Sequence, residues 1–211
     1  MKKNPGFVQT FSRIAPVYEE KYGAKLSLAH DECLRTLNRL LDTSIPRRVL
    51  DIGCGTGALL ERLHAQWPDA SYAGVDPAQG MVDESAKRRP FASFIRGTAE
   101  FLPFPSESMD LVICSMSFGH WYDKSAGLHE VRRLLKPQGL FCLVEHTPAG
   151  WGVTTLVNWV LGSLADYRPE HEVIRLAQAA GLHSVEGRVT DQPVIVAAFR
   201  RYCTDPVQHG Q

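Results

Sequence analysis

The residues with the clearest chemical potential lie in residues 49–58, which read Val-Leu-Asp-Ile-Gly-Cys-Gly-Thr-Gly-Ala. An apolar run leads into three alternating glycines, Gly53, Gly55 and Gly57, and an amphipathic segment follows them. Glycines at the end of a strand permit a tight turn and let a ligand approach the backbone closely. The segment therefore predicts a strand, then a ligand-binding loop, then a helix.

Two cofactor chemistries fit this loop. Read as Gly-x-Gly-x-x-Ala from Gly53 to Ala58, it satisfies the dinucleotide fingerprint, and Asp76 stands where an acid would bind ribose hydroxyls. The Asp51 carboxylate opposes a dinucleotide, since about 4 Å from a phosphate charge it would cost on the order of 4 kcal/mol at an effective dielectric near 20. Beside a cation the same interaction is favourable. S-Adenosylmethionine carries an ammonium and a sulfonium and offers a ribose to Asp76, so it fits this loop better.

The elements that must position this loop alternate along the middle of the chain. The predicted strands are residues 47–52, 71–75, 92–96, 109–114 and 140–144, and the predicted helices are residues 58–66, 78–89, 125–135 and 170–180. Such alternation predicts an α/β fold in which helices cover both faces of a parallel sheet. Two closely spaced runs, residues 184–189 and 194–199, predict a hairpin and an antiparallel strand at one edge. The sheet is therefore mixed, with about seven strands.

The residues before the first strand read as two helices, around residues 5–22 and 26–41. An open α/β sheet binds ligands beyond the carboxyl ends of its strands, and these helices are candidates to cover that edge. We expect one domain with three parts. They are an N-terminal helical cap (1–45), a cofactor-binding core (46–146), and a substrate-side segment with the C-terminal hairpin (147–211).

Five motifs stand in order along the chain. They are FSRIAPVY at 11–18, DIGCGTG at 51–57, VDPAQGM at 75–81, GTAEFLPF at 97–104, and 118–139, which ends in EVRRLLKPQG. Together they resemble class I S-adenosylmethionine-dependent methyltransferases of the ubiquinone/menaquinone-biosynthesis-like, methyltransferase type 11 branch. The resemblance implies a Rossmann-like seven-stranded sheet with the last strand antiparallel. It also implies S-adenosyl-L-methionine as cofactor, S-adenosyl-L-homocysteine as product, and no metal.

The resemblance implies a set of cofactor-binding residues. They are Tyr18, Asp51, Gly53, Cys54, Gly55, Thr56, Asp76, Pro77, Met81, Thr98, Ala99, Glu100, Ser115 and Ser117. The backbone from Gly53 to Gly55 should lie against the methionine portion, and Asp51 should orient its ammonium, partly through water. Asp76 should accept both ribose hydroxyls. Met81 should pack on adenine, although a helical methionine often only fills a gap in the core.

The chain departs from the family pattern at Thr98, where an aspartate commonly receives the adenine amino group. A threonine hydroxyl can accept one hydrogen bond but carries no charge, so Glu100 is a candidate to compensate. The Ala99 amide should reach the adenine ring nitrogen. The Ser115 carbonyl should bind the ammonium, with Ser117 as the alternative.

Two residues near the loop have less obvious roles. Tyr18, in a leading helix, is expected to close over the cofactor. Cys54 stands beside a predicted helix N-terminus, where a thiol can become reactive. Because methyl transfer needs no covalent intermediate, we interpret Cys54 as a small filler.

The methyl acceptor should lie beyond the ends of the fourth and fifth strands. His146 and His120 stand there and are candidate general bases, although either could be a surface residue. Trp121, Tyr122 and Trp151 could wall an apolar substrate pocket, or the tryptophan at 151 could anchor its segment on the core.

The amino-acid composition argues against several classes of binding partner. The 211 residues hold 23 Lys and Arg against 23 Asp and Glu, a formal net charge of zero, which disfavours nucleic acid and a polybasic membrane surface. The 5 cysteines are spread without a Cys-x-x-Cys pair, which argues against a zinc site or a disulfide framework. No run of residues is apolar and long enough for a membrane span, and no secretory signal is apparent. We expect a cytoplasmic protein, monomeric or homodimeric.

The sequence thus predicts a methyltransferase that acts on a small, apolar or aromatic molecule at an oxygen, sulfur or carbon atom. Two alternatives stay open. One is an NAD(P)-dependent oxidoreductase, which Asp51 and the ordered motifs oppose. The other is a non-catalytic cofactor-binding subunit of the same fold, which no residue type excludes because this family has no universal catalytic side chain.

Overall fold

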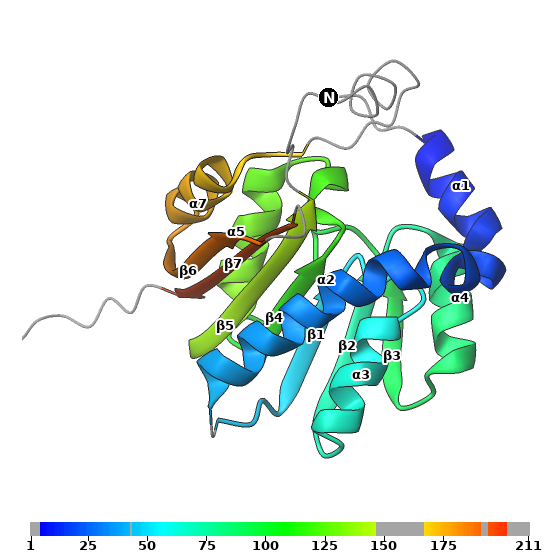
Figure 1. The fold of residues 1–211 in the computed structure, drawn as a ribbon, viewed down its shortest axis with the longest axis horizontal. Coiled ribbons are helices and arrows are strands. Elements are labelled where there is room, and N and C mark those ends of the chain that lie inside the picture. Colours follow the sequence, from blue (N-terminus) through cyan, green and yellow to red (C-terminus); the bar gives the residue numbers. More distant parts are fainter. Residues whose placement is uncertain (1–4, 43, 147–166, 191–193, 202–211) are drawn as a thin grey trace, which may run out of the picture.

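The computed structural model describes residues 5–42, 44–146, 167–190 and 194–201. Its strands are β1 (Arg48–Ile52), β2 (Ser71–Asp76), β3 (Ala92–Arg96), β4 (Met109–Ser115), β5 (Leu135–His146), β6 (Leu182–Val189) and β7 (Val194–Arg201). They form a seven-stranded sheet in the order β3-β2-β1-β4-β5-β7-β6 (Figure 1). The first five strands are parallel, and β7 is antiparallel to both β5 and β6. The predicted mixed sheet with an antiparallel last strand is confirmed.

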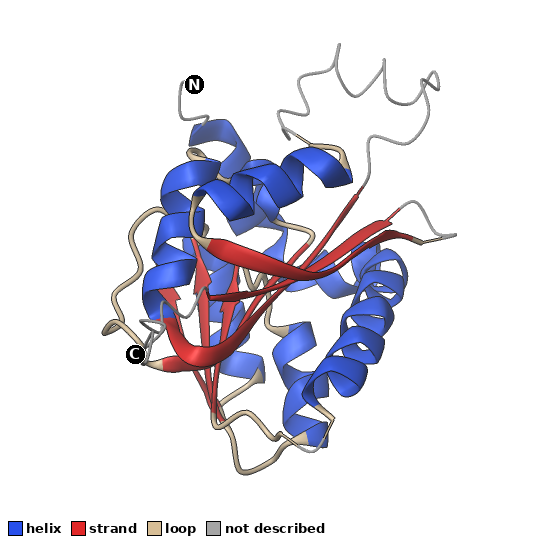
Figure 2. Ribbon diagram, turned by 90° about the vertical axis from the view of Figure 1, so that its left-hand side faces the viewer, coloured by secondary structure: helices blue, strands red, loops and turns tan. Residues whose placement is uncertain are grey.

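Helices cover both faces of this sheet (Figure 2). The helical segments of the described residues are α1 (Pro5–Ile14), η1 (Ala15–Val17), α2 (Tyr18–Leu41), α3 (Ala58–Gln66), α4 (Gln79–Arg88), η2 (Phe118–His120), α5 (Lys124–Leu134) and α7 (Glu170–Ala179). In the central strand β1, Val49 packs in the core cluster of α2 and α3, whereas Leu50 and Ile52 pack in the cluster of α5 and α7. Because both faces of such a strand are buried, the apolar Val49, Leu50 and Ile52 do not alternate with polar residues in the usual way.

The N-terminal helices divide at a different point from the one predicted. We expected a break between residues 22 and 26, but α1 ends at Ile14 and α2 runs unbroken from Tyr18 to Leu41. Pro16 explains the break, since it lacks an amide hydrogen and stands in the short 3₁₀ turn η1. Gly23 does not interrupt α2, because a single glycine within a long helix is tolerated.

The fifth strand is longer than the predicted residues 140–144. It begins at Leu135, which pairs with Met109, and its pairing with β4 resumes at Leu140 opposite Leu111. The Lys-Pro-Gln-Gly turn, residues 136–139, is therefore an irregularity in the ladder rather than the gap between a helix and a strand.

Two further observations concern the described part of the chain. Its cysteines, Cys33, Cys54, Cys114 and Cys142, are buried free thiols. None of its helices has both the length and the apolar character needed to cross a bilayer.

Candidate active site

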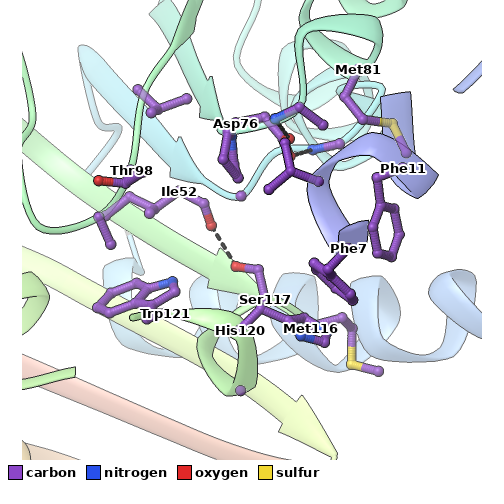
Figure 3. Close-up of a pocket in the computed structure, with 18 of the residues that line it drawn as sticks. Phe7, Phe11, Ile52, Asp76, Met81, Thr98, Met116, Ser117, His120 and Trp121 are labelled. Carbon is purple, nitrogen blue, oxygen red and sulfur yellow. Dashed lines mark hydrogen bonds between the residues drawn. The ribbon is translucent and has the colours of Figure 1, made fainter. Parts of the chain in front are cut away.

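A cavity of about 330 Å³ lies beyond the carboxyl ends of the central strands, in the size range of small-molecule sites. Figure 3 shows Asp76 and Met81 on one side of it and Trp121 and His120 on the other. The predicted site residues that line it are Tyr18, Gly53, Gly55, Asp76, Pro77, Met81, Thr98, Ala99, Glu100, Ser117, His120, Trp121, Tyr122 and His146. The structure therefore brings together most residues of both predicted groups.

The glycine loop forms one end of the cavity, and its backbone requires glycine. Gly53, Gly55 and Gly57 have φ of 75°, 54° and 85°, which L side chains rarely adopt. A Cβ on Gly53 would also lie 2.4 Å from the Ser117 side chain. Ser117 in turn donates a 2.6 Å hydrogen bond from Oγ to the carbonyl of Ile52 (Figure 3). The loop is thus held against the residue that follows β4.

Asp76 ties the same loop to the end of β2. Its Oδ2 accepts from the Gly55 amide at 3.0 Å, and its Oδ1 accepts from the Ala78 amide at 2.9 Å. Burial raises the pKa of Asp76 to about 6, although the two amide hydrogen bonds favour the carboxylate. Each oxygen of a carboxylate can accept more than one hydrogen bond, so Asp76 can also receive hydroxyl donors from the cavity.

Asp51 lies deeper, 2% exposed, and does not line the cavity itself. Burial, and then the nearby Asp76, raise its pKa to about 8. Its Oδ1 has no hydrogen-bond partner among the described residues. A buried carboxylate oxygen without a donor is costly, and a cation or a bridging water at this end of the cavity would satisfy it.

The neighbouring wall of the cavity is formed by the residues predicted to hold adenine. Met81 is buried and packs against Phe11 and Tyr18 of the N-terminal helices. Thr98 and Glu100 line the cavity from the loop after β3. Glu100 also accepts a hydrogen bond from the Asp123 amide through Oε1, at 3.0 Å, so its carboxylate is already engaged.

Three more predicted cofactor residues lie behind the cavity wall. Burial raises the pKa of the Cys54 thiol well above its usual range, which supports its interpretation as a filler. Thr56 is buried, and its carbonyl accepts from Arg89 at 3.0 Å. Ser115 has a buried hydroxyl without a partner among the described residues, and of the two candidate serines Ser117 is the one that lines the cavity.

The other end of the cavity is aromatic. The His120 ring lies 4.2 Å from that of Phe7 in α1 and 6.4 Å from that of Tyr167, centroid to centroid. Burial and then Lys124 lower the pKa of His120 to about 4. Burial and then Lys25 lower the pKa of His146, whose ring lies 5.9 Å from that of Tyr167. Both imidazoles are therefore neutral near neutral pH.

Trp121 forms the floor between the two ends. It is 6% exposed, and its ring lies 5.0 Å from that of Phe118. Its Nε1 is buried and has no hydrogen-bond partner among the described residues. Tyr122 lines the cavity beside it, and the predicted substrate residue Trp151 lies outside the described residues.

Glu145 has a positioning role that the sequence did not reveal. It is 1% exposed, and its carboxylate accepts from the amides of Gly119 and His146, both at 2.9 Å. Burial raises its pKa to about 7, against the effect of these hydrogen bonds. This carboxylate fixes the turn that carries His120 to the end of the strand that carries His146.

Other lining residues were also missed. They are Phe7, Val8, Phe11, Tyr22, Lys25, Leu26, Ile52, Val75, Ala78, Gly97, Met116, Gly119 and Tyr167. The spacing of Phe7 and Phe11, one helical turn apart and followed by Tyr18 and Tyr22, could have indicated an aromatic face on the cap.

The arrangement separates two kinds of chemistry. The glycine loop, Asp76 and Asp51 suit a ligand with hydroxyl groups and a positive charge. The aromatic end suits an apolar or flat molecule, and it holds two neutral imidazoles. Two molecules, one bound at each end, would meet beside Trp121.

Comparison with known proteins gives the relationships of the chain. A family described as "Methyltransferase domain" matches residues 49–139. An uncharacterized methyltransferase of Mycobacterium tuberculosis is 34% identical over 172 residues, which cover 77% of this chain and 68% of the relative. A Campylobacter jejuni ubiquinone/menaquinone biosynthesis C-methyltransferase is 27% identical over 157 residues, which cover 70% of this chain. The chain spans only 66% of that relative's length.

Solved structures share the fold. In the Haloferax volcanii complex between the Trm112 methyltransferase activator and a methyltransferase, one chain superposes with a TM-score of 0.70. The alignment covers 91% of this chain and 97% of that chain at 20% identity. At this identity the similarity concerns the fold alone.

Proposed function

The chain belongs to the class I S-adenosylmethionine-dependent methyltransferases of the ubiquinone/menaquinone-biosynthesis-like type, and we propose that it methylates a small apolar or aromatic molecule. The observation that carries the proposal is the shape of one cavity. A glycine loop with two buried carboxylates forms one end, and aromatic side chains form the other.

The residues at the first end fit S-adenosylmethionine. Asp51 Oδ1, which has no partner among the described residues, suits the ammonium of the methionine portion, directly or through water. Asp76 can accept the ribose hydroxyls. The loop backbone at Gly53 and Gly55 would lie against the methionine portion. Met81 would pack on adenine, with Thr98 and the Ala99 amide at its polar edge. When bound, this cofactor supplies a sulfonium methyl group that a nucleophile can displace.

The chain's own contribution to the reaction is alignment and exclusion of water. Tyr18, Phe7 and Phe11 cover the cavity from the N-terminal helices, and Trp121 supports it from the opposite side. An acceptor held between the aromatic rings would present its oxygen, sulfur or carbon atom in line with the methyl group. The Trp121 ring, which lines the cavity, would bound the space that the acceptor occupies.

His146 is the proposed general base for an acceptor that must lose a proton. His120 is the weaker candidate, because an imidazole with a pKa of about 4 is a poor proton acceptor for a phenol or thiol. Each pKa unit by which the base lies below the acceptor costs about 1.4 kcal/mol for the proton transfer. We assign His120 to the wall that stacks against the acceptor. Both roles depend on Glu145, which fixes the two segments together.

A net charge of zero favours a small acceptor over nucleic acid, and the chemistry needs no metal. We propose a cytoplasmic protein, monomeric or homodimeric, with a cap at 1–45, a core at 46–146 and a substrate-side segment at 147–211 that includes Trp151.

Two titrations and one activity screen test the proposal. Calorimetry should detect binding of S-adenosylhomocysteine and none of NADH, and binding of NADH alone would instead support the oxidoreductase. Methyl-labelled S-adenosylmethionine should then label at least one member of a panel of phenols, thiols and quinols. Tight cofactor binding with complete inactivity across the panel would support the non-catalytic subunit.

A further inference from the structure

Arg89 is a buried cation that lies outside the cavity, directly after α4. Its side chain is 4% exposed and donates to both oxygens of Glu19, at 2.6 and 3.1 Å. It also donates to Glu61 Oε2 at 2.8 Å and to the Thr56 carbonyl at 3.0 Å. A guanidinium that is bidentate to one carboxylate and shared with a second is a strongly directional contact.

The partners of Arg89 belong to three different parts of the fold. Glu19 is in the first turn of α2, Thr56 is in the glycine loop, and Glu61 is in the first turn of α3. Arg89 therefore joins Glu19 of the N-terminal cap to Thr56 of the glycine loop.

Glu19 directly follows Tyr18, which covers the loop. A Cβ on Gly55 would lie 3.8 Å from the Tyr18 ring, an ordinary van der Waals contact. Burial, and then the charge of Asp76, raise the pKa of Tyr18 to about 12, which reflects its place over the same end of the cavity. The position of Glu19 thus sets the position of Tyr18 above Gly55.

The same junction holds further contacts between the cap and α4. Arg88 donates to the Pro16 carbonyl at 3.0 Å, and the Gly80 amide donates to Ser12 Oγ at 3.3 Å. Leaving a buried guanidinium with fewer partners is costly. If the cap moved away, Arg89 would keep only Glu61 as a carboxylate partner, so the docked arrangement is favoured.

We propose that Arg89 is a positioning residue for cofactor binding, which holds Tyr18 over the glycine loop through its pairing with Glu19. The inference rests on the proposed function, since it takes this end of the cavity as the S-adenosylmethionine site. Neither Arg89 nor Glu19 lines the cavity. Arg89 acts through Tyr18 and Thr56.

The two carboxylate partners of Arg89 supply a matched pair of variants. Glu19→Gln weakens the link to the cap, whereas Glu61→Gln weakens a link within the core. Calorimetry with S-adenosylhomocysteine should show that Glu19→Gln raises the dissociation constant roughly tenfold, and that Glu61→Gln changes it less than about twofold. In turnover assays, Glu19→Gln should raise the KM for S-adenosylmethionine while kcat at saturation stays near that of wild type.

A third variant tests Arg89 itself. Arg89→Lys keeps the charge but loses the bidentate geometry, and it should weaken binding about as much as Glu19→Gln. The double variant should weaken binding by less than the sum of the two single effects, because both substitutions disrupt the contact between Arg89 and Glu19.

Equal effects of Glu19→Gln and Glu61→Gln would show a merely structural cation, as would unchanged binding by Arg89→Lys, and either result would overturn the inference. A wild-type protein that binds no S-adenosylhomocysteine would overturn the proposed function together with the inference. Wild-type binding with unaffected variants overturns the inference alone.

Discussion

The two ends of the cavity are built by different means. At the glycine-loop end, backbone hydrogen bonds hold the structure together. The Gly55 and Ala78 amides donate to Asp76, and the Gly53 amide donates to the Val75 carbonyl at 2.7 Å. At the aromatic end, side chains from α1, α2, η2, the end of β5 and Tyr167 pack together. The first end depends on a few adjacent residues, and the second on residues scattered over the chain.

The electrostatics differ in the same way. Asp51 and Asp76 give the loop end carboxylates whose pKa values are raised by burial, to about 8 and about 6. At the aromatic end the imidazoles of His120 and His146 have lowered pKa values and are neutral. Burial thus favours the neutral form of the titratable groups at both ends. A cationic ligand would favour ionisation only of the carboxyl groups at the loop end. Substitutions at one end should therefore change cofactor binding, and those at the other should change turnover.

The largest effect is expected at the aromatic end. If His146 is the general base, His146→Ala should lower kcat by about 10²- to 10⁴-fold while the S-adenosylhomocysteine dissociation constant stays nearly constant. The wild-type rate should rise with pH as His146 loses its proton, with a midpoint below the usual histidine value because burial lowers its pKa. The variant should lose this dependence.

His120→Ala is the matched control and should slow turnover only a few-fold, through the loss of its ring contact with Phe7. The reverse result would exchange the two roles. If neither substitution slows turnover more than a few-fold, then alignment alone carries the reaction, as expected for a carbon acceptor or one already ionised.

The second prediction concerns the loop end. Asp76→Ala should weaken S-adenosylhomocysteine binding by about 1.5 to 3 kcal/mol, the range for hydrogen bonds to a charged group. Calorimetry measures this effect, and circular dichroism should show an intact fold because Asp76 lies at the cavity surface. An unchanged dissociation constant would remove Asp76 from the site.

The loop end was easier to predict from the sequence than the aromatic end, because its residues lie close together along the chain. Gly53, Gly55, Asp51 and Asp76 lie within two adjacent strand–loop–helix units, so local glycine and aspartate positions predicted them, and the parallel sheet followed from the same alternation. At the aromatic end, His120, His146, Trp121 and Tyr122 were predicted from their places after two strands. The contribution of Phe7 was not, since nothing in the local pattern pairs it with residues more than 100 positions away.

Burial also hid particular contacts. Glu145 reads as a polar residue at a strand end, and only the folded backbone places two amides around its carboxylate. The predicted break between the two leading helices was wrong, because Pro16 lacks an amide hydrogen and ends the first helix earlier than predicted.

The third prediction uses the raised pKa of Asp51. An Asp whose pKa is about 8 when folded, against about 3.9 when unfolded, contributes stability that is present at low pH and is lost as pH rises toward 8. Asp51→Asn should therefore be more stable than wild type at pH 8, and thermal melting should show this difference shrinking toward pH 4. Each kcal/mol corresponds to about 2–4 °C for a chain of this size.

Asp51→Asn should stabilise the fold at pH 8 but weaken ligand binding at the same pH. A cationic ligand favours the ionised carboxylate, so wild-type affinity for S-adenosylhomocysteine should rise several-fold between pH 6 and pH 8. Asp51→Asn should bind more weakly at pH 8 and lose most of this dependence. A variant that is destabilised at pH 8 and binds normally would show that Asp51 is a structural group.

The smallest effect is expected at Thr98, which is proposed to contact the amino group of adenine. Two substitutions test this contact separately, one by removing the hydroxyl and one by adding a charge. Thr98→Val removes the hydroxyl at constant shape and should weaken binding by about 0.5 to 1.5 kcal/mol if that hydroxyl accepts the adenine amino group. Thr98→Asp should bind as well as wild type or better, because a charged acceptor roughly doubles a neutral hydrogen bond. The neighbouring Glu100, whose carboxylate also lines the cavity, would offset part of this gain by repulsion. Calorimetry at pH 8 compares the two variants directly. Weaker binding by Thr98→Asp together with unchanged binding by Thr98→Val would place adenine elsewhere, because the hydroxyl would then make no contact and the new charge would only oppose Glu100.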